Sequence, residues 1–88
     1  MKRWSILFKT FGNINRLKIV LLLVRHGQMA VGDVAKEIKI SVKSASKNLV
    51  LLQQLDILES IGTSGHVFYD INQSMQKDAR QIIALITK

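Results

Sequence analysis

The sequence predicts a mainly α fold that carries a small β-hairpin. Apolar residues recur at helical spacing through most of residues 3–54 and again near the C-terminus, whereas residues 57–71 are rich in β-branched and aromatic side chains. The chain contains no proline and five glycines, so it has few helix breakers. Its 88 residues are enough for one modest core, so residues 1–88 are expected to form a single domain. Because it has no cysteine, the sequence offers no disulfide and no thiolate metal site, which is compatible with the cytoplasm.

The first predicted element is a short helix over residues 3–11. Trp4, Leu7, Phe8 and Phe11 are spaced i, i+3, i+4 and i+7, so they share one face of this helix. A short terminal helix with so much aromatic surface is expected to pair with a second copy of the chain.

A second helix is expected to run from a cap at Asn13 to about Arg25. Gly12 should end the first helix, and Gly27 should supply a left-handed stop after the second. Because the second helix is apolar nearly all round, it should lie at the centre of the fold.

Two further helices follow, joined by a tight turn. Residues 28–30 are expected to be extended, and residues 31–38 should form a two-turn helix. After a turn at Lys39 and Ile40, Ser41 can cap the next helix with its hydroxyl group. Two helices joined in this way predict a helix-turn-helix.

The helix that follows Ser41 is expected to be the recognition helix. Stepping 100° per residue places Val42, Ala45, Leu49 and Leu52 on its inward face. Its first two turns expose lysine, serine and asparagine, side chains that can bind bases or phosphates in a major groove. The candidate groove and base contacts are Lys43, Ser44, Lys47 and Asn48; the candidate phosphate contacts are Ser41 and Ser46, with Lys36 and Lys39 beside the turn and Arg16 as a further candidate.

A hairpin and a last helix complete the chain. The strands are expected at residues 57–61 and 66–71, around a glycine-flanked tip at residues 62–65, and this hairpin corresponds to the wing of a winged helix-turn-helix. A helix that begins at Asn72 or Ser74 should pack with the first helix at a subunit interface. The candidate wing contacts to the minor groove or flanking phosphates are Thr63, Ser64 and His66; the candidate dimer-interface residues are Trp4, Leu7, Phe8, Phe11, Met75, Ala79, Ile82, Ile83 and Ile86.

Positive charge is concentrated in the first part of the chain. Residues 1–54 contain ten Lys or Arg against two acidic residues, whereas residues 55–88 contain three against four. A one-sided positive field suits nucleic acid or an anionic membrane surface. The longest apolar run, Ile19–Val24, has six residues, so no membrane span is expected, and the N-terminus lacks the cleavage site of a signal peptide.

Several segments, in order, give the sequence a resemblance to the ArsR/SmtB family of winged-helix transcriptional repressors. Asn15–Val20 is similar to the family's TRLRIL opening, Ser46–Leu52 to its SRHLKVL recognition segment, Leu55–Leu58 to AGLV, and Val67–Ile71 to VYYRL. The resemblance covers nearly the whole chain. It implies a homodimer that binds an operator and represses transcription until a ligand releases it.

The sequence also departs from this family at informative positions. Where metal-sensing members carry Cys-Val-Cys, this chain has Ala30, Val31 and Gly32, which supply no thiolate or imidazole ligand. No metal and no other cofactor is therefore expected. Lys39 stands where a turn glycine is usual, which predicts a strained turn, and Val42 replaces a frequent polar base reader.

The sequence thus predicts a homodimeric regulator that binds specific double-stranded DNA, and two alternatives stay open. One is a non-specific architectural DNA-binding protein, which Val42 and the lack of a visible sensor favour. The other is a winged-helix protein-interaction module, which would be expected to show an acidic or apolar recognition face. Because the carboxylates are scattered and neither histidine has a positioned acid, no enzymatic activity is expected.

Overall fold

A computed structural model describes residues 2–63 and 65–87, and these residues form five helices and three strands. The order along the chain agrees with the order predicted from the sequence. The elements are α1 (Lys2–Phe11), α2 (Ile14–His26), β1 (Met29–Ala30), α3 (Val31–Ile38), α4 (Val42–Gln54), β2 (Leu58–Thr63), β3 (His66–Ile71) and α5 (Lys77–Ile86).

The strands form one antiparallel sheet in the order β1-β3-β2, so the predicted extended piece and hairpin pair with each other. Met29 of β1 is opposite Tyr69 of β3, and the β2–β3 pairing runs from Leu58 opposite Ile71 to Thr63 opposite His66. The first hairpin strand begins one residue later than predicted. Ile57 instead completes the turn after α4, since its N–H donates to the Leu52 carbonyl.

The central position predicted for α2 is confirmed. Ile19, Val20 and Leu23 are buried, and residues from every other helix and from all three strands join them in one core. Asn13 caps α2 by accepting hydrogen bonds from the N–H groups of Asn15 and Arg16. The core fixes how the remaining helices are placed relative to α2.

The helix α2 ends at a glycine, but not in the left-handed helical conformation expected. Gly27 has φ 87° and ψ −156°, a region of backbone space that essentially only glycine occupies. Its N–H still donates to the Leu23 carbonyl, so this carbonyl in the last turn of α2 has a hydrogen-bond partner. The chain then turns sharply into β1.

The turn between α3 and α4 contains the strain that the sequence predicted. Lys39 has φ 60° and ψ 50°, the left-handed conformation that usually selects glycine. The Ile40 N–H donates to the Ala35 carbonyl at 3.0 Å, and the Ser41 hydroxyl accepts from the Ser44 N–H at 3.0 Å. These two bonds end α3 and begin α4 within three residues, which gives the tight connection of a helix-turn-helix.

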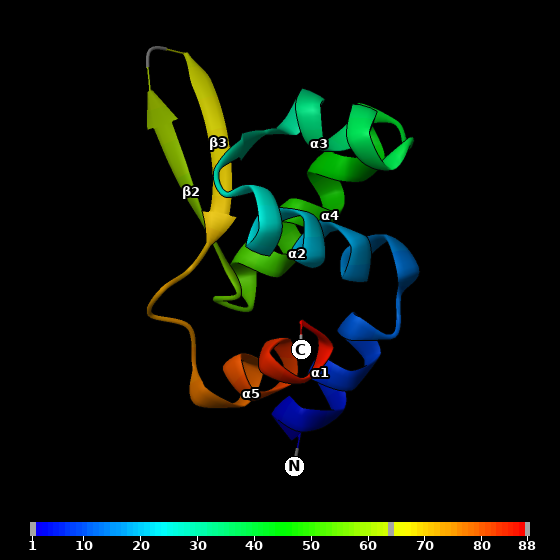
Figure 1. The fold of residues 1–88 in the computed structure, drawn as a ribbon, viewed down its shortest axis with the longest axis vertical. Coiled ribbons are helices and arrows are strands. Elements are labelled where there is room, and N and C mark those ends of the chain that lie inside the picture. Colours follow the sequence, from blue (N-terminus) through cyan, green and yellow to red (C-terminus); the bar gives the residue numbers. More distant parts are fainter. Residues whose placement is uncertain (1, 64, 88) are drawn as a thin grey trace.

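The terminal helices lie side by side at one end of the long axis, and the tip of the β2–β3 hairpin lies at the other (Figure 1). The helix α5 begins at Lys77, later than predicted, because Asn72 starts a turn: its side chain accepts from the Ser74 N–H and its carbonyl from the Met75 N–H. Met75 therefore precedes the helix.

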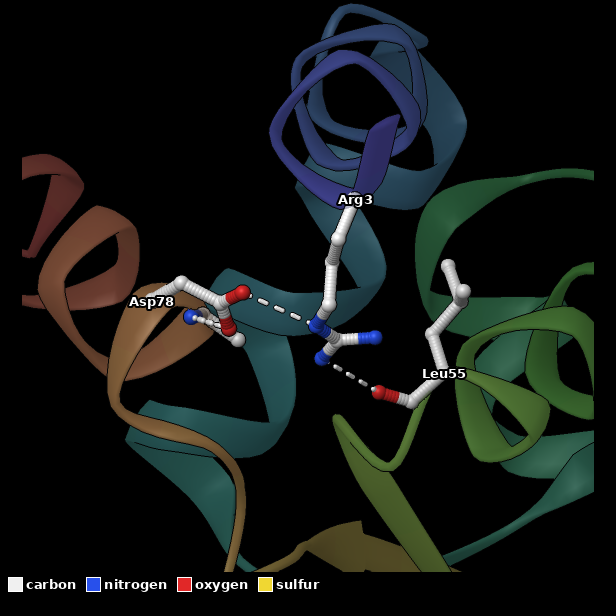
Figure 2. Close-up of polar contacts among 4 residues, drawn as sticks. Arg3, Leu55 and Asp78 are labelled. Atoms are coloured by element: carbon white, nitrogen blue, oxygen red, sulfur yellow. Dashed lines mark hydrogen bonds and ion pairs between the residues drawn. The ribbon is translucent and has the colours of Figure 1, made fainter. Parts of the chain in front are cut away.

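An arginine joins the terminal helices to the end of α4. The Arg3 Nε of α1 donates to the Asp78 carboxylate of α5 at 2.8 Å, and its Nη2 donates to the Leu55 carbonyl at 3.1 Å (Figure 2). The Arg3 and Asp78 side chains are 29% and 18% exposed. The partly shielded ion pair and the second hydrogen bond of Arg3 together hold three segments that are distant in sequence.

Most of the side chains expected at a dimer interface also belong to the core of the subunit. Six of them are buried there, each at most 8% exposed, and their place at a dimer interface stays a prediction: Leu7, Phe11, Met75, Ala79, Ile82 and Ile83. Of the other three, Phe8 is 64% exposed and stacks on the half-buried Trp4 at 5.7 Å between ring centroids, and Ile86 is half-buried.

Candidate nucleic-acid interface

The N-terminal half of α4 presents the cationic surface predicted for a recognition helix. Lys43 and Lys47 are exposed, and α4 contains no acidic residue. Ala45, Leu49 and Leu52 are buried and anchor the opposite face. The first turn of a helix is already the positive end of its dipole, so Lys43 there raises the positive potential further. A cation at this end does not stabilise the helix itself, but it does stabilise a bound anion.

The inward placement expected for Val42 is wrong. Its side chain is 57% exposed, because it lies in the first turn of α4, ahead of the turns whose residues reach the core. An aliphatic group is therefore on the outer surface of the recognition helix. In a major groove such a group can contact the methyl group of thymine.

The polar residues at the start of α4 differ in whether they make hydrogen bonds within the protein. The Ser41 hydroxyl caps the helix, and the Ser44 carbonyl accepts from the Asn48 amide nitrogen at 3.1 Å. Ser44, Ser46 and Asn48 are half-buried. Lys43 and Lys47 have no hydrogen-bond partner among the residues that the structure describes, and the same is true of the exposed Lys36 and Lys39 before α4.

Arg16 is brought to the recognition helix by α2. Its Nε donates to the Asn48 side-chain oxygen at 3.2 Å, and both side chains are half-buried. An open groove of about 400 Å³ lies beside this contact, and Ser46, Lys47 and Gln54 are among its lining residues. The sequence identified Arg16 and Asn48 separately; the groove depends on how α2 crosses α4.

Of the candidate wing contacts, His66 is the one whose side chain the structure describes. His66 is exposed at the start of β3, where it pairs with Thr63, and its ring lies 6.4 Å from that of Phe68. Ser64 lies outside the described residues. Toward the base of the hairpin, Ser60 of β2 accepts a hydrogen bond from Gln53 of α4 at 2.9 Å, so the wing is tied to the recognition helix.

In the described part of the chain, no three His, Asp or Glu side chains gather where they could hold a metal ion. No helix within residues 2–63 and 65–87 is long and apolar enough to cross a membrane.

This geometry defines the class of protein. Two helices joined by a tight turn, a lysine-bearing second helix and a following hairpin form a winged helix-turn-helix. No family model matches the chain. It is 31% identical to the transcriptional repressor SdpR of Bacillus subtilis over 72 residues, which cover 82% of this chain and 79% of SdpR. The chain therefore belongs to the ArsR/SmtB family of winged helix-turn-helix transcriptional regulators.

Other comparisons agree with this assignment. The cadmium resistance transcriptional regulatory protein CadC of Listeria innocua is 38% identical over 64 residues, which cover 73% of this chain but only 54% of CadC. The structure of the transcriptional repressor BigR from Xylella fastidiosa is 30% identical with a TM-score of 0.77, over 94% of this chain and 79% of BigR. The homodimeric winged helix-turn-helix domain of Mb0332 from Mycobacterium bovis is 26% identical with a TM-score of 0.79, over 97% of this chain and 75% of that domain.

Proposed function

We propose that this chain acts in the cytoplasm as a transcriptional repressor that binds a specific double-stranded DNA site as a homodimer. The observation that carries the proposal is the exposed pair Lys43 and Lys47 on the second helix of the helix-turn-helix, on a helix without acidic residues. Lysines at these positions can reach phosphates and guanine edges when the helix lies in a major groove. The names of SdpR and BigR as transcriptional repressors support the same function.

Exposed apolar side chains support the homodimer. Phe8 is 64% exposed on α1 and Leu85 is 71% exposed on α5, and these two helices are joined by the Arg3–Asp78 ion pair. Large apolar groups gathered on adjoining elements are typical of a subunit interface. The homodimeric state of the similar Mb0332 domain supports this assignment. A dimer would present two copies of α4 to successive major grooves, about 34 Å apart.

The proposal includes no metal ion, no cofactor and no catalytic step. The residues at the position of the family's cysteine motif, Ala30, Val31 and Gly32, carry no donor atom in their side chains. Regulation would then depend on the amount of protein or on a ligand other than a metal ion.

The proposal is tested by titrating the protein against its own upstream DNA and against a random duplex at several salt concentrations. The expected result is tighter binding to the upstream DNA, and a loss of at least about 100-fold in Lys43→Ala/Lys47→Ala, since four charged contacts disappear per dimer. Lys2→Ala/Lys77→Ala removes the same charge from exposed positions at the other end and should bind nearly as tightly as the unaltered protein.

Each other outcome contradicts a stated part of the proposal. Equal affinity for both duplexes with one steep salt dependence would indicate an architectural DNA-binding protein. If neither duplex binds at low salt, DNA binding is refuted, and the face of α4 should be tested as a protein-docking surface.

A further inference from the structure

Asn48 is held by two hydrogen bonds within the subunit. Its side-chain oxygen accepts from Arg16 Nε at 3.2 Å, and its side-chain nitrogen donates to the Ser44 carbonyl at 3.1 Å. The orientation of the amide follows from its partners, because a guanidinium group can only donate and a carbonyl can only accept. Both ends of this half-buried amide are therefore engaged by the protein.

This engagement conflicts with the role that the sequence predicted for Asn48. An asparagine that reads adenine uses the same oxygen and nitrogen as a pair, aligned with the edge of the base. One lone pair and one N–H of Asn48 remain after its bonds to Arg16 and Ser44, but those two bonds, and not the edge of a base, fix the direction in which they point. The geometry favours a side chain that holds a neighbour in place.

Arg16 is that neighbour, and its terminal nitrogens are free to bind an anion. Within residues 2–63 and 65–87, neither a carboxylate nor any other acceptor contacts its Nη1 or Nη2. The side chain lines the open groove beside Lys47 and Ser46. The planar guanidinium group can bind a phosphate with two parallel hydrogen bonds. The groove therefore combines a cation held by Asn48 with the exposed cation of Lys47.

We infer that Arg16 binds a phosphate of the DNA backbone next to the recognition helix, and that Asn48 is a positioning residue that holds Arg16 rather than a residue that reads a base. This inference rests on the proposed function. It adds a contact from α2 to the interface and removes one base contact from α4. The phosphate contact fixes how α4 lies in the groove, whereas sequence is read by the other exposed residues of α4.

The test measures affinity for the upstream and random duplexes at several salt concentrations with Arg16→Ala, Arg16→Gln and Asn48→Ala. Glutamine at position 16 removes the charge but can still donate to Asn48, so it separates phosphate binding from packing. Both Arg16 variants should lose about tenfold or more on both duplexes, and the salt slope should fall by about 1.8 for two subunits. Asn48→Ala should weaken both duplexes by similar factors and leave the preferred bases unchanged.

Two results would overturn the inference while the unaltered protein still binds DNA. An unchanged salt slope in Arg16→Gln would show that Arg16 contacts no phosphate. A loss of preference at one A·T position in Asn48→Ala, at an unchanged salt slope, would show that Asn48 reads a base. If the unaltered protein binds neither duplex, the proposed function itself fails, and that outcome is distinct from the other two. Thermal unfolding of each variant verifies that the fold is retained.

Discussion

Two arginines at different places in the molecule have opposite environments. Arg3 donates to the Asp78 carboxylate and to the Leu55 carbonyl, so it is paired with a charge of the protein itself and joins α1, α5 and the end of α4 (Figure 2). Arg16 makes one hydrogen bond to a described residue, to the neutral amide of Asn48, and faces an open groove. An arginine paired with a carboxylate of its own subunit stabilises the fold, whereas one without such a partner beside an exposed lysine can bind an external anion.

The same contrast extends to the surfaces around the two arginines. Around α1 and α5 the exposed side chains include large apolar groups, Phe8 and Leu85. On the first half of α4 they include Lys43 and Lys47. Apolar surface suits a second protein subunit, and cationic surface suits a polyanion, so we expect the two regions to respond to different substitutions.

The largest effect on the apolar region is expected from Leu85→Glu. A carboxylate placed in an apolar subunit interface loses its hydration without a partner, so the dimer should dissociate at least about 100-fold more readily. Sedimentation equilibrium over a range of protein concentrations measures this change. Ser74→Glu introduces the same charge at an exposed position before α5 and should leave the dimer intact. A Leu85→Glu protein that dimerises as well as the unaltered chain would remove Leu85 from the interface.

A smaller effect is expected from Arg3→Ala. Removing this side chain leaves the partly shielded Asp78 carboxylate without its cation and the Leu55 carbonyl without its donor, which should lower the free energy of unfolding by about 2 kcal/mol. Urea unfolding at fixed protein concentration gives the value. Lys2→Ala, at the exposed neighbouring position, should change it by less than about 0.5 kcal/mol. Equal losses in the two variants would mean that the Arg3 junction adds no stability.

The smallest effect is expected at the turn before α4. Lys39 has φ 60°, so Lys39→Gly should raise the free energy of unfolding by about 0.5–1 kcal/mol through relief of backbone strain. Lys39→Ala removes the same charge but keeps the strain, which makes it the matched control. Thermal unfolding compares the two. If the Lys39→Gly protein is no more stable than the Lys39→Ala protein, the left-handed backbone at this position does not lower the free energy of unfolding.

The fold could be predicted because its signals are local. Apolar spacing, the caps at Asn13 and Ser41, and the glycine-flanked hairpin each depend on a few adjacent residues, and each predicted the correct element. Boundaries were less accurate where a side chain competes with helix formation, as Asn72 does before α5.

The site could be predicted only in part, because exposure depends on tertiary packing. Helical periodicity placed Val42 inward, yet the first turn of α4 extends beyond the core. Periodicity also cannot distinguish a stripe that faces a partner from one that faces the subunit's own core: Leu7 and Ala79, expected at a subunit interface, are fully buried within the subunit. The contact between Arg16 and Asn48 joins residues 32 positions apart, and no local pattern predicts it.

The most direct test of the division between the two regions is to measure both unfolding and DNA affinity for Arg3→Ala and Arg16→Gln. Arg3→Ala should lose about 2 kcal/mol of stability and, under conditions where it is folded and dimeric, keep the salt slope of DNA binding. Arg16→Gln should keep its stability within about 0.5 kcal/mol and lose about 1.8 from that slope. If both variants lose stability and salt slope in parallel, the two arginines do not have separate roles, and the account is wrong.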